Sequence, residues 1–258
     1  MAVDKLNTRF LEKVWGSPHL SPWFPDSSSK IGEAWFEAPD GTQLPLLVKF
    51  IFTTERLSIQ VHPGDDYAAL HHQANGKTEM WHILRADPGA QVALGLRHAL
   101  ASGKHLREAS ESGEILDLMN WIDVKAGDTF FVPAGTIHAI GAGLAICEIQ
   151  QFSDVTYRLY DYGRPRELHL DDGVAVSDLG VFAPIAQPPG WLVRCKYFNT
   201  DLIEVHGSLD AILGPAMLVA IDGAGTLNGT PFRQGEAWRI ESDQLSITGP
   251  ARFLRASV

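Results

Sequence analysis

The sequence predicts a mainly β protein in which a barrel carries a metal site. Glycine (24 residues) and proline (15 residues) are frequent in this chain of 258 residues, and long stretches of helical periodicity are few, which favours strands and turns. Three short stretches, residues 57–63, 76–81 and 127–141, combine strand and turn patterns with side chains able to bind one divalent metal ion. The same three stretches therefore predict both the fold class and the metal site.

The composition limits the class of partner. An apolar share of 45% is that of a soluble globular protein, and the length suffices for one large or two small domains. The net charge is −10 and basic residues form no cluster, so nucleic-acid binding is not expected, because the phosphate backbone requires Lys and Arg. A small anionic substrate is compatible with this total, since a few local cations suffice to bind it.

Cysteine usage and the absence of long apolar runs predict a cytoplasmic protein. Cys147 and Cys195 lie in separate apolar contexts, so no disulfide framework is indicated. The first 16 residues lack a basic segment followed by an apolar core, and no signal peptide is expected. No segment approaches the roughly 20 apolar residues of a membrane span, so no membrane partner is expected.

The first half of the chain alternates predicted strands and turns. Residues 1–45 are expected to form an irregular lead-in with a loop at 17–29, interrupted by a strand at 31–39. Two strands flank a turn at 53–56. A polar loop with Gly64, Asp65, Asp66, Asn75 and Gly76, which also holds His71 and His72, precedes strands at 78–86 and 90–97.

Helical pattern is confined to two short segments. Residues 98–120 form the predicted helical insertion, divided by Gly103 and Gly113. Strands with tight turns are expected over 121–151 and 153–163, and a short helix within 164–180. Residues 182–190, rich in proline, resemble a linker.

This pattern predicts three parts. Residues 1–170 are expected to form the catalytic, metal-binding barrel with its lead-in and insertion, 171–190 a linker, and 191–258 a smaller second barrel. The C-terminal part contains neither an HxH nor a PxGxxH pattern, so we expect it to bind no metal. Its one histidine, His206, is expected at the surface.

Four residues form the candidate metal site. Gln60 and His62 are two apart in a strand, so their side chains point to the same face. Glu79 opens the next apolar strand, and His138 follows a Pro133–Gly135 turn. Two imidazoles, a carboxylate and an amide oxygen suit Zn²⁺ or another first-row metal, with positions left for a substrate.

Each of these residues also has an ordinary structural interpretation. A single strand histidine is more often structural than a ligand, and Glu79 alone is compatible with a solvated strand start. The joint pattern favours the metal, because inward-facing Gln60 and His62 need a buried partner and one ion supplies it for all four side chains.

Longer motifs resemble a known family. Gly127-x5-Pro133-x-Gly135-x2-His138 resembles the second motif of cupin barrels, which are antiparallel jelly rolls. Together, SIQVHP, GKTEMWHIL, VPAGTIHAI and EIQQFSDVTYRLYDYGR closely resemble type I mannose-6-phosphate isomerases of the compact bacterial subgroup, from about residue 31 to residue 170. The resemblance implies a cupin jelly-roll barrel, a second, smaller metal-free cupin-like barrel, and a helical insertion shorter than is common in the family.

The resemblance places the zinc ligands of the family on Gln60, His62, Glu79 and His138. The first histidine of the usual HxH cupin motif is replaced by Gln60, and Glu79 lies further along the chain. The isomerases share this departure, which argues against an oxygen-activating dioxygenase with a three-histidine iron site.

The resemblance also implies catalytic and substrate-binding residues. Glu148 corresponds to the carboxylate proposed to transfer the proton, Arg158 to an arginine over the site, and Lys77 to a lysine that stabilises charge on the substrate. Ser58 and Lys49 match positions linked to phosphate recognition. A structural interpretation stays open for two of them: Glu148 as the ion-pair partner of Arg158, and Lys49 as a strand lysine that extends to solvent.

The implied activity is an aldose–ketose isomerase that interconverts mannose 6-phosphate and fructose 6-phosphate through an enediol, with one Zn²⁺ per chain. Other divalent first-row metals satisfy the same ligands. The alternatives are an isomerase of a different or unphosphorylated sugar, and a non-catalytic cupin that senses sugar. The expected partner is a small phosphosugar, and the chain is expected to be a monomer or a homodimer. Residues 161–164 are expected at the mouth of the site.

Overall fold

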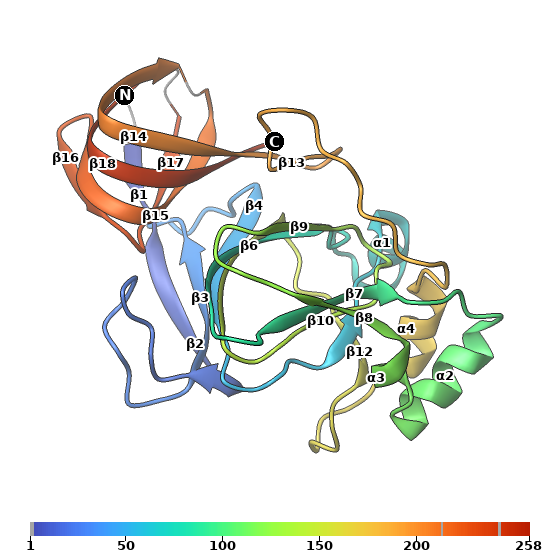
Figure 1. Cartoon of the computed structure of the whole chain (residues 1–258). Helices are drawn as coiled ribbons and strands as arrows, with labels where there is room; N and C mark the ends of the chain where they lie inside the picture. Colours follow the sequence, from blue (N-terminus) through green and yellow to red (C-terminus); the bar gives the residue numbers. More distant parts are fainter. Residues whose placement is uncertain (1–2, 213, 242–243) are drawn as a thin grey trace. The chain divides into compact units, whose positions relative to one another are not determined.

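The computed structural model describes residues 3–212, 214–241 and 244–258, and these residues are mainly β (Figure 1). The strands are β1 (Val3–Lys5), β2 (Asn7–Ser17), β3 (Ile31–Glu37), β4 (Leu46–Phe52), β5 (Ile59–Val61), β6 (Glu79–Ala86), β7 (Gln91–Leu96), β8 (Met119–Asp123), β9 (Thr129–Val132), β10 (His138–Ile140), β11 (Leu144–Gln151), β12 (Tyr157–Tyr160), β13 (Val193–Arg194), β14 (Asn199–Ile212), β15 (Ala216–Leu227), β16 (Thr230–Arg233), β17 (Ala237–Ile240) and β18 (Gln244–Ser257). The helices are α1 (Asp65–His72), α2 (Gly103–Ser112), α3 (Ile115–Leu118) and α4 (Leu170–Val176).

The chain divides into two compact units. One unit contains residues 51–185, and the other contains residues 1–50 together with 186–258. This division groups the N-terminal segment with the C-terminal strands. The three parts expected from the sequence stay a prediction: a catalytic barrel at 1–170, a linker at 171–190 and a second barrel at 191–258. None of the helices among the described residues is long and apolar enough to cross a membrane.

A five-stranded antiparallel sheet, in the order β12-β5-β10-β7-β8, forms one wall of the 51–185 unit. Its register sets one row of directly opposed residues, in which Arg158 lies opposite Gln60, Gln60 opposite His138, and His138 opposite Leu94. Directly opposed residues in an antiparallel pair project to the same face. The strand pairing therefore brings two predicted metal ligands and Arg158 to one face of this sheet.

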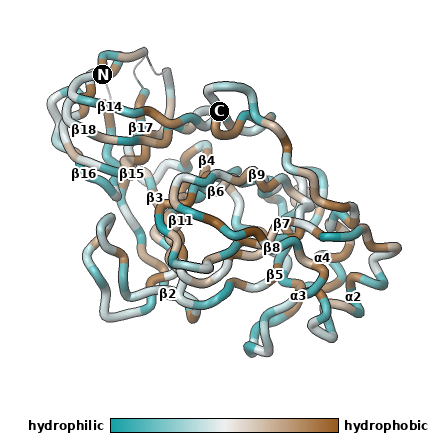
Figure 2. The backbone as a smooth tube through the Cα atoms, viewed as in Figure 1, coloured by the Kyte–Doolittle hydropathy of each residue, from teal (hydrophilic) through white to brown (hydrophobic). Residues whose placement is uncertain are grey.

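The other face of the same sheet is apolar and covered by helices. Alternate residues Ile59, Val61 and Ala139 belong to a buried cluster that also contains Leu106 and Ala109 of α2. Figure 1 shows α2, α3 and α4 grouped beside β8 and β12. In Figure 2 hydrophobic colours run along the central strands and hydrophilic colours along much of the loops. This alternation leaves the opposite face free to carry polar residues.

A second wall of the unit is formed around β6, which pairs with β9 on one side and β11 on the other. Glu79 lies opposite Gln150, and Trp81 lies opposite Glu148. Because Glu79 and Trp81 are two residues apart on β6, all four side chains project to the same face.

The other unit has its own sheet and core. Its seven-stranded sheet has the order β1-β17-β15-β18-β14-β13, with β16 added to β15. β14 and β18 pair along 14 positions, from Asn199 with Ser257 to Ile212 with Gln244. Leu218, Trp238 and Phe253 are among the buried residues of its core. His206 on β14 is exposed, as expected.

Two predictions of secondary structure were wrong. The expected irregular lead-in contains β1 and β2, because β1 pairs with β17 more than 230 residues away and β2 pairs with β3. These long-range backbone hydrogen bonds stabilise a segment whose own apolar alternation is weak. The expected polar loop after residue 63 contains α1, in which Asp65 and Asp66 occupy the favourable first turn and Gln73 ends the helix in the left-handed conformation.

The helical insertion and the short helix after residue 164 are confirmed. Ser102 caps α2, because its side chain accepts a hydrogen bond from the backbone N–H of His105. Gly113 ends the helix at φ 85°, which separates α2 from α3 as the sequence predicts. Gly103, in contrast, is the first residue of α2 and divides nothing.

Candidate metal centre

Three strands bring the predicted metal ligands together. Gln60 lies in β5 and His62 directly after it, Glu79 is the first residue of β6, and His138 is the first residue of β10. The turn before His138 places Gly135 at φ 87°, and the backbone N–H of Gly135 donates to the carbonyl of His62. This hydrogen bond ties the loop that carries one histidine to the residue that carries the other.

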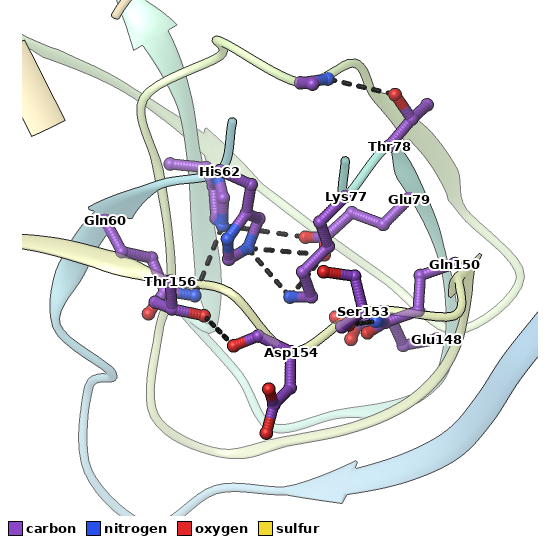
Figure 3. A network of polar contacts seen from close by, with 12 residues as sticks. Gln60, His62, Lys77, Thr78, Glu79, Glu148, Gln150, Ser153, Asp154 and Thr156 are labelled. Atoms are coloured by element: carbon purple, nitrogen blue, oxygen red, sulfur yellow. Dashed lines mark hydrogen bonds and ion pairs between the residues drawn. The ribbon is translucent and has the colours of Figure 1, made fainter. Parts of the chain in front are cut away.

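His62, Glu79 and His138 form a buried group whose ligand atoms all lie within 4.8 Å of one another. Nε2 of His62 is 3.4 Å from Oε2 of Glu79, and Nε2 of His138 is 3.5 Å from Oε1. The amide Nε2 of Gln60 is 3.3 Å from Nε2 of His138. Figure 3 shows the side chains of Gln60, His62 and Glu79 converging. The three residues of the group could hold a metal ion, and Gln60 lies beside them.

Backbone carbonyls orient both imidazoles. Nδ1 of His62 lies 3.0 Å from the carbonyl oxygen of Val155, and Nδ1 of His138 lies 2.9 Å from that of Thr136. A carbonyl oxygen only accepts, so each Nδ1 carries the proton and each Nε2 offers a lone pair to the site. This second hydrogen bond on a histidine is the usual support of a metal ligand.

Burial keeps His138 neutral. Burial, together with the nearby charge of Lys77, lowers the pKa of His138 to about 4. A neutral imidazole is the form that binds a metal. The donor set, the tautomers and the protonation of His138 therefore all fit a divalent metal ion.

Lys77 lies inside the same group. Its Nζ is 2.8 Å from Nε2 of His62 and 2.8 Å from Oε2 of Glu79. The side chain is buried, so this ammonium is held by two of the proposed ligand atoms rather than by water. Sequence reasoning expected Lys77 near the substrate, and the structure places it against the ligands themselves.

Glu148 approaches the group through Trp81. The indole Nε1 of Trp81 donates to Oε2 of Glu148 at 2.8 Å and to Oε1 of Glu79 at 3.0 Å. Sequence reasoning missed Trp81 because a tryptophan in an apolar strand resembles a core residue. Its position two residues after Glu79 was the available signal, since it places both side chains on one face.

Ser58 acts on Gln60. Its hydroxyl donates to Oε1 of Gln60 at 3.2 Å, which turns the Nε2 of the amide toward His138. If the amide rotates by half a turn, Oε1 faces the ligand group and the Ser58 hydroxyl accepts from Nε2 instead. The hydroxyl thus supports the amide in either orientation.

Lys49 is buried on β4 and belongs to the other compact unit. Its Nζ lies 3.6 Å from Oε1 of Glu33 and 5.4 Å from the centre of the Trp35 ring. The alternative of a lysine extended to solvent is therefore wrong, because the side chain is buried against a carboxylate and an aromatic ring. Its link to phosphate recognition stays a prediction.

Arg158 brings positive charge to the row of site residues. One of its Nη atoms donates to the carbonyl of Glu167 at 2.7 Å. Burial, with the nearby guanidinium groups of Arg166 and Arg164, lowers the pKa of Arg158. The structural pairing of Arg158 with Glu148 stays an open alternative.

Further buried donors follow Arg158 on the segment expected at the mouth. Three side-chain polar groups here are buried and have no hydrogen-bond partner among the described residues: Nε of Arg158, the hydroxyl of Tyr162 and Nη1 of Arg164. The guanidinium of Arg164 stacks over the Tyr162 ring at 5.3 Å. Sequence reasoning named residues 161–164 only as a mouth, and the two arginines six residues apart were the missed signal.

Comparison with known proteins identifies the family. The chain is 44% identical over 194 residues to a mannose-6-phosphate isomerase of Streptococcus mutans, a match that spans 69% of this chain and 60% of that protein. It is 34% identical to the mannose-6-phosphate isomerase ManA of Bacillus subtilis, in a match that covers 88% of this chain and 89% of the relative. The chain belongs to the mannose-6-phosphate isomerase family. No family profile matches it.

The family assignment agrees with the fold. The crystal structure of the mannose 6-phosphate isomerase from Bacillus subtilis superimposes with a TM-score of 0.90 and 26% identity, covering 100% of both chains. The putative mannosephosphate isomerase of Archaeoglobus fulgidus, at 18% identity and a TM-score of 0.83, shares the fold. The predicted mainly β, cupin-like fold with few helices is confirmed.

Proposed function

We propose that this member of the mannose-6-phosphate isomerase family interconverts mannose 6-phosphate and fructose 6-phosphate. The observation that carries the proposal is the buried His62–Glu79–His138 group, placed beside a further buried carboxylate, Glu148, in a chain related to enzymes of this name. The reaction moves one proton from C2 of the aldose to C1 and one proton from O2 to O1, through an enediol, so no oxidant or second substrate is required.

Gln60, His62, Glu79 and His138 would hold one Zn²⁺, as the resemblance implies. When bound, the ion would supply Lewis-acid chemistry to the reaction. Two neutral imidazoles, a carboxylate and an amide oxygen also accept Mn²⁺, Fe²⁺ or Co²⁺, and zinc is proposed from the family likeness.

Glu148 is the proposed proton-transfer group. It removes the proton from C2 as a base and returns it to C1 as an acid. Its Oε2 is held by the Trp81 N–H, which orients the carboxylate before substrate arrives. Lys77, whose Nζ lies beside Glu79, would stabilise the negative charge that develops on the enediol oxygens.

The basic segment around β12 supports recognition of a phosphorylated sugar. Arg158, Tyr162 and Arg164 offer buried donors without partners among the described residues, and burial raises the pKa of Tyr162 to about 12, so its hydroxyl keeps its proton. Guanidinium groups bind phosphate in bidentate fashion. Ser58 and Lys49 stay candidate phosphate-binding residues from the family likeness.

A coupled assay of mannose 6-phosphate conversion to fructose 6-phosphate tests the proposal. Turnover is expected to disappear with a chelator and to return when zinc is restored. Free mannose is expected to give no turnover. If the folded, metal-loaded protein leaves mannose 6-phosphate unchanged, the proposal is wrong, and an isomerase of another sugar or a sugar sensor takes its place. The cytoplasmic location and the monomeric or homodimeric state stay predictions.

A further inference from the structure

One indole N–H lies between two buried carboxylates of the centre. Nε1 of Trp81 is 3.0 Å from Oε1 of Glu79 and 2.8 Å from Oε2 of Glu148. Trp81 has no exposed surface, and the two carboxylates are 1% and 2% exposed. Water therefore does not screen the interaction, and the N–H is the shared donor of both groups.

The strand register places these groups together. Glu79 and Trp81 project to the same face of β6, and Glu148 stands directly opposite Trp81 on β11. An indole nitrogen only donates, so the oxygens it contacts must be the accepting oxygens of their carboxyl groups. The ring also packs against the His138 imidazole at 5.4 Å, with an interplanar angle of 70°. Trp81 thus contacts the proposed base and two proposed ligands.

We propose that Trp81 is a positioning residue that couples the metal ligand Glu79 to the base Glu148. The inference rests on the proposed function for the role of Glu148. Two carboxylates held this close in a buried site repel each other, and a shared N–H offsets that repulsion. A bound metal ion draws negative charge from Glu79, so the N–H interacts more strongly with Glu148. Metal binding then fixes the base in its working position.

Trp81→Phe tests this coupling, because it removes the N–H and keeps most of the ring. Loss of a hydrogen bond to a charged group predicts a kcat lower by about 10- to 100-fold, with KM for mannose 6-phosphate unchanged within about twofold. Affinity for Zn²⁺, measured by competition with a chromophoric chelator, is expected to change by about threefold or more. An unchanged kcat together with an unchanged zinc affinity would overturn the proposal.

Trp23→Phe is the matched control. Trp23 is also buried, and its Nε1 donates to the carbonyl of Ile221 at 2.8 Å in the other compact unit. This variant removes an indole N–H without touching a carboxylate of the centre. It is expected to keep both kcat and zinc affinity, whatever it does to the melting temperature.

A double-mutant cycle separates positioning from packing. If Trp81 acts through Glu148, then W81F added to E148Q lowers kcat less than about twofold, because the group it positions no longer works as a base. A full, additive loss in the E148Q background indicates packing alone and overturns the proposal. Zinc affinity, measured in all four proteins, gives a second cycle that does not depend on turnover. If the effects of W81F and E148Q on zinc affinity simply add in the double variant, that result also contradicts the coupling.

The coupling can also be tested with Trp81 itself left unsubstituted. With ¹⁵N-labelled tryptophan, the Trp81 indole resonance is expected to shift on zinc titration and to shift again in E148Q, while the Trp23 resonance stays in place. A Trp81 resonance that responds to neither change overturns the proposal, even where W81F fails to fold. If the wild type does not convert mannose 6-phosphate, the proposed function is wrong. The response of the Trp81 resonance to zinc still tests the interaction between Trp81 and Glu79, because it does not depend on turnover.

Discussion

Single hydrogen bonds define the chemistry of the centre. The carbonyls of Val155 and Thr136 accept from Nδ1 of the two histidines, which leaves both Nε2 atoms to face Glu79. The side chain of Ser58 supports the amide of Gln60 in the same way. At the scale of the residue, the site is prepared for a cation by its neighbours rather than by its ligands alone.

His138→Ala is expected to lose metal and activity together. The substitution removes one of the imidazole ligands and leaves Glu79 with one partner fewer. Metal content measured by atomic absorption is expected to fall with turnover in the coupled assay. Turnover that survives with no metal bound would contradict the proposed site.

Lys77→Met is expected to raise zinc affinity while lowering turnover. The Nζ of Lys77 contacts the same atoms of His62 and Glu79 that a metal ion would use, so removing this charge removes both competition and repulsion. The Coulomb energy of charges this close predicts a gain of about tenfold or more. Chelator competition measures the affinity, and a weaker affinity in the variant would show that Lys77 supports the metal instead.

At the scale of the element, strand alternation sorts polar from apolar residues. On the five-stranded sheet, Gln60, His138 and Arg158 share one face, and Ile59 and Val61 pack under the helices on the other. The turns then position the ligand residues that follow them in the chain, as the Gly135 turn positions His138. Gly135 at φ 87° is needed because a Cβ there would be strained and would lie 3.2 Å from the carbonyl oxygen of Val176.

Gly135→Ala is expected to weaken both folding and metal binding. The left-handed conformation predicts a loss of about 1–2 kcal/mol in the free energy of unfolding, measured in urea. Because the turn positions His138, zinc affinity is expected to fall as well. Gly127→Ala is the control, since Gly127 has φ 91° but open space around its Cβ position. It should lose similar stability and keep its zinc affinity.

A tyrosine links α1 to α4 and predicts a dependence on alkaline pH. The hydroxyl of Tyr67 donates to Oδ1 of Asp172 at 2.7 Å, and this hydrogen bond raises the pKa of Tyr67 to about 12. A raised pKa gives stability that is complete below the unfolded value near 10 and is lost as pH rises toward 12. Relative to Tyr67→Phe, the wild type is expected to lose unfolding free energy between these pH values. Parallel curves for the two proteins would contradict the linkage.

At the scale of the whole molecule, segments from the two ends of the sequence together form one of the two compact units. The N-terminal strand β1 pairs with β17, and the backbone N–H of Leu6 donates to the carbonyl of Ala237 at 2.9 Å. Arg239 on β17 reaches back to Asp4 and Asp40. The unit formed by residues 1–50 and 186–258 therefore depends on chain segments that are far apart in sequence.

Leu6→Ala is expected to destabilise this unit although Leu6 lies near the chain start. Leu6 is 3% exposed, and removal of a buried leucine side chain costs about 2–5 kcal/mol. Leu70→Ala is the control, because Leu70 is 80% exposed and its loss should change little. Urea unfolding compares the two. Equal stabilities would show that the N-terminal segment contributes nothing to the unit.

The sequence allowed most strands between residues 31 and 163 to be predicted, because their apolar runs end at clear turn residues. The prediction failed for β1 and β2, whose stability comes from remote partners, and for α1, whose polar residues resemble a loop. Trp81 was missed for a related reason. Its indole N–H gains a role only when β11 brings Glu148 opposite to it.

The sequence by itself determined which donor atoms are present and, through their spacing, which of them share a strand face. Only the tertiary structure decided that Gln60 stands opposite His138, that Lys77 contacts the ligands, and that one indole joins two carboxylates. The physical reason is that alternation along a strand is local, whereas register depends on pairing between strands far apart in sequence. Gln60 and His138 are 78 residues apart, and Trp81 and Glu148 are 67 residues apart.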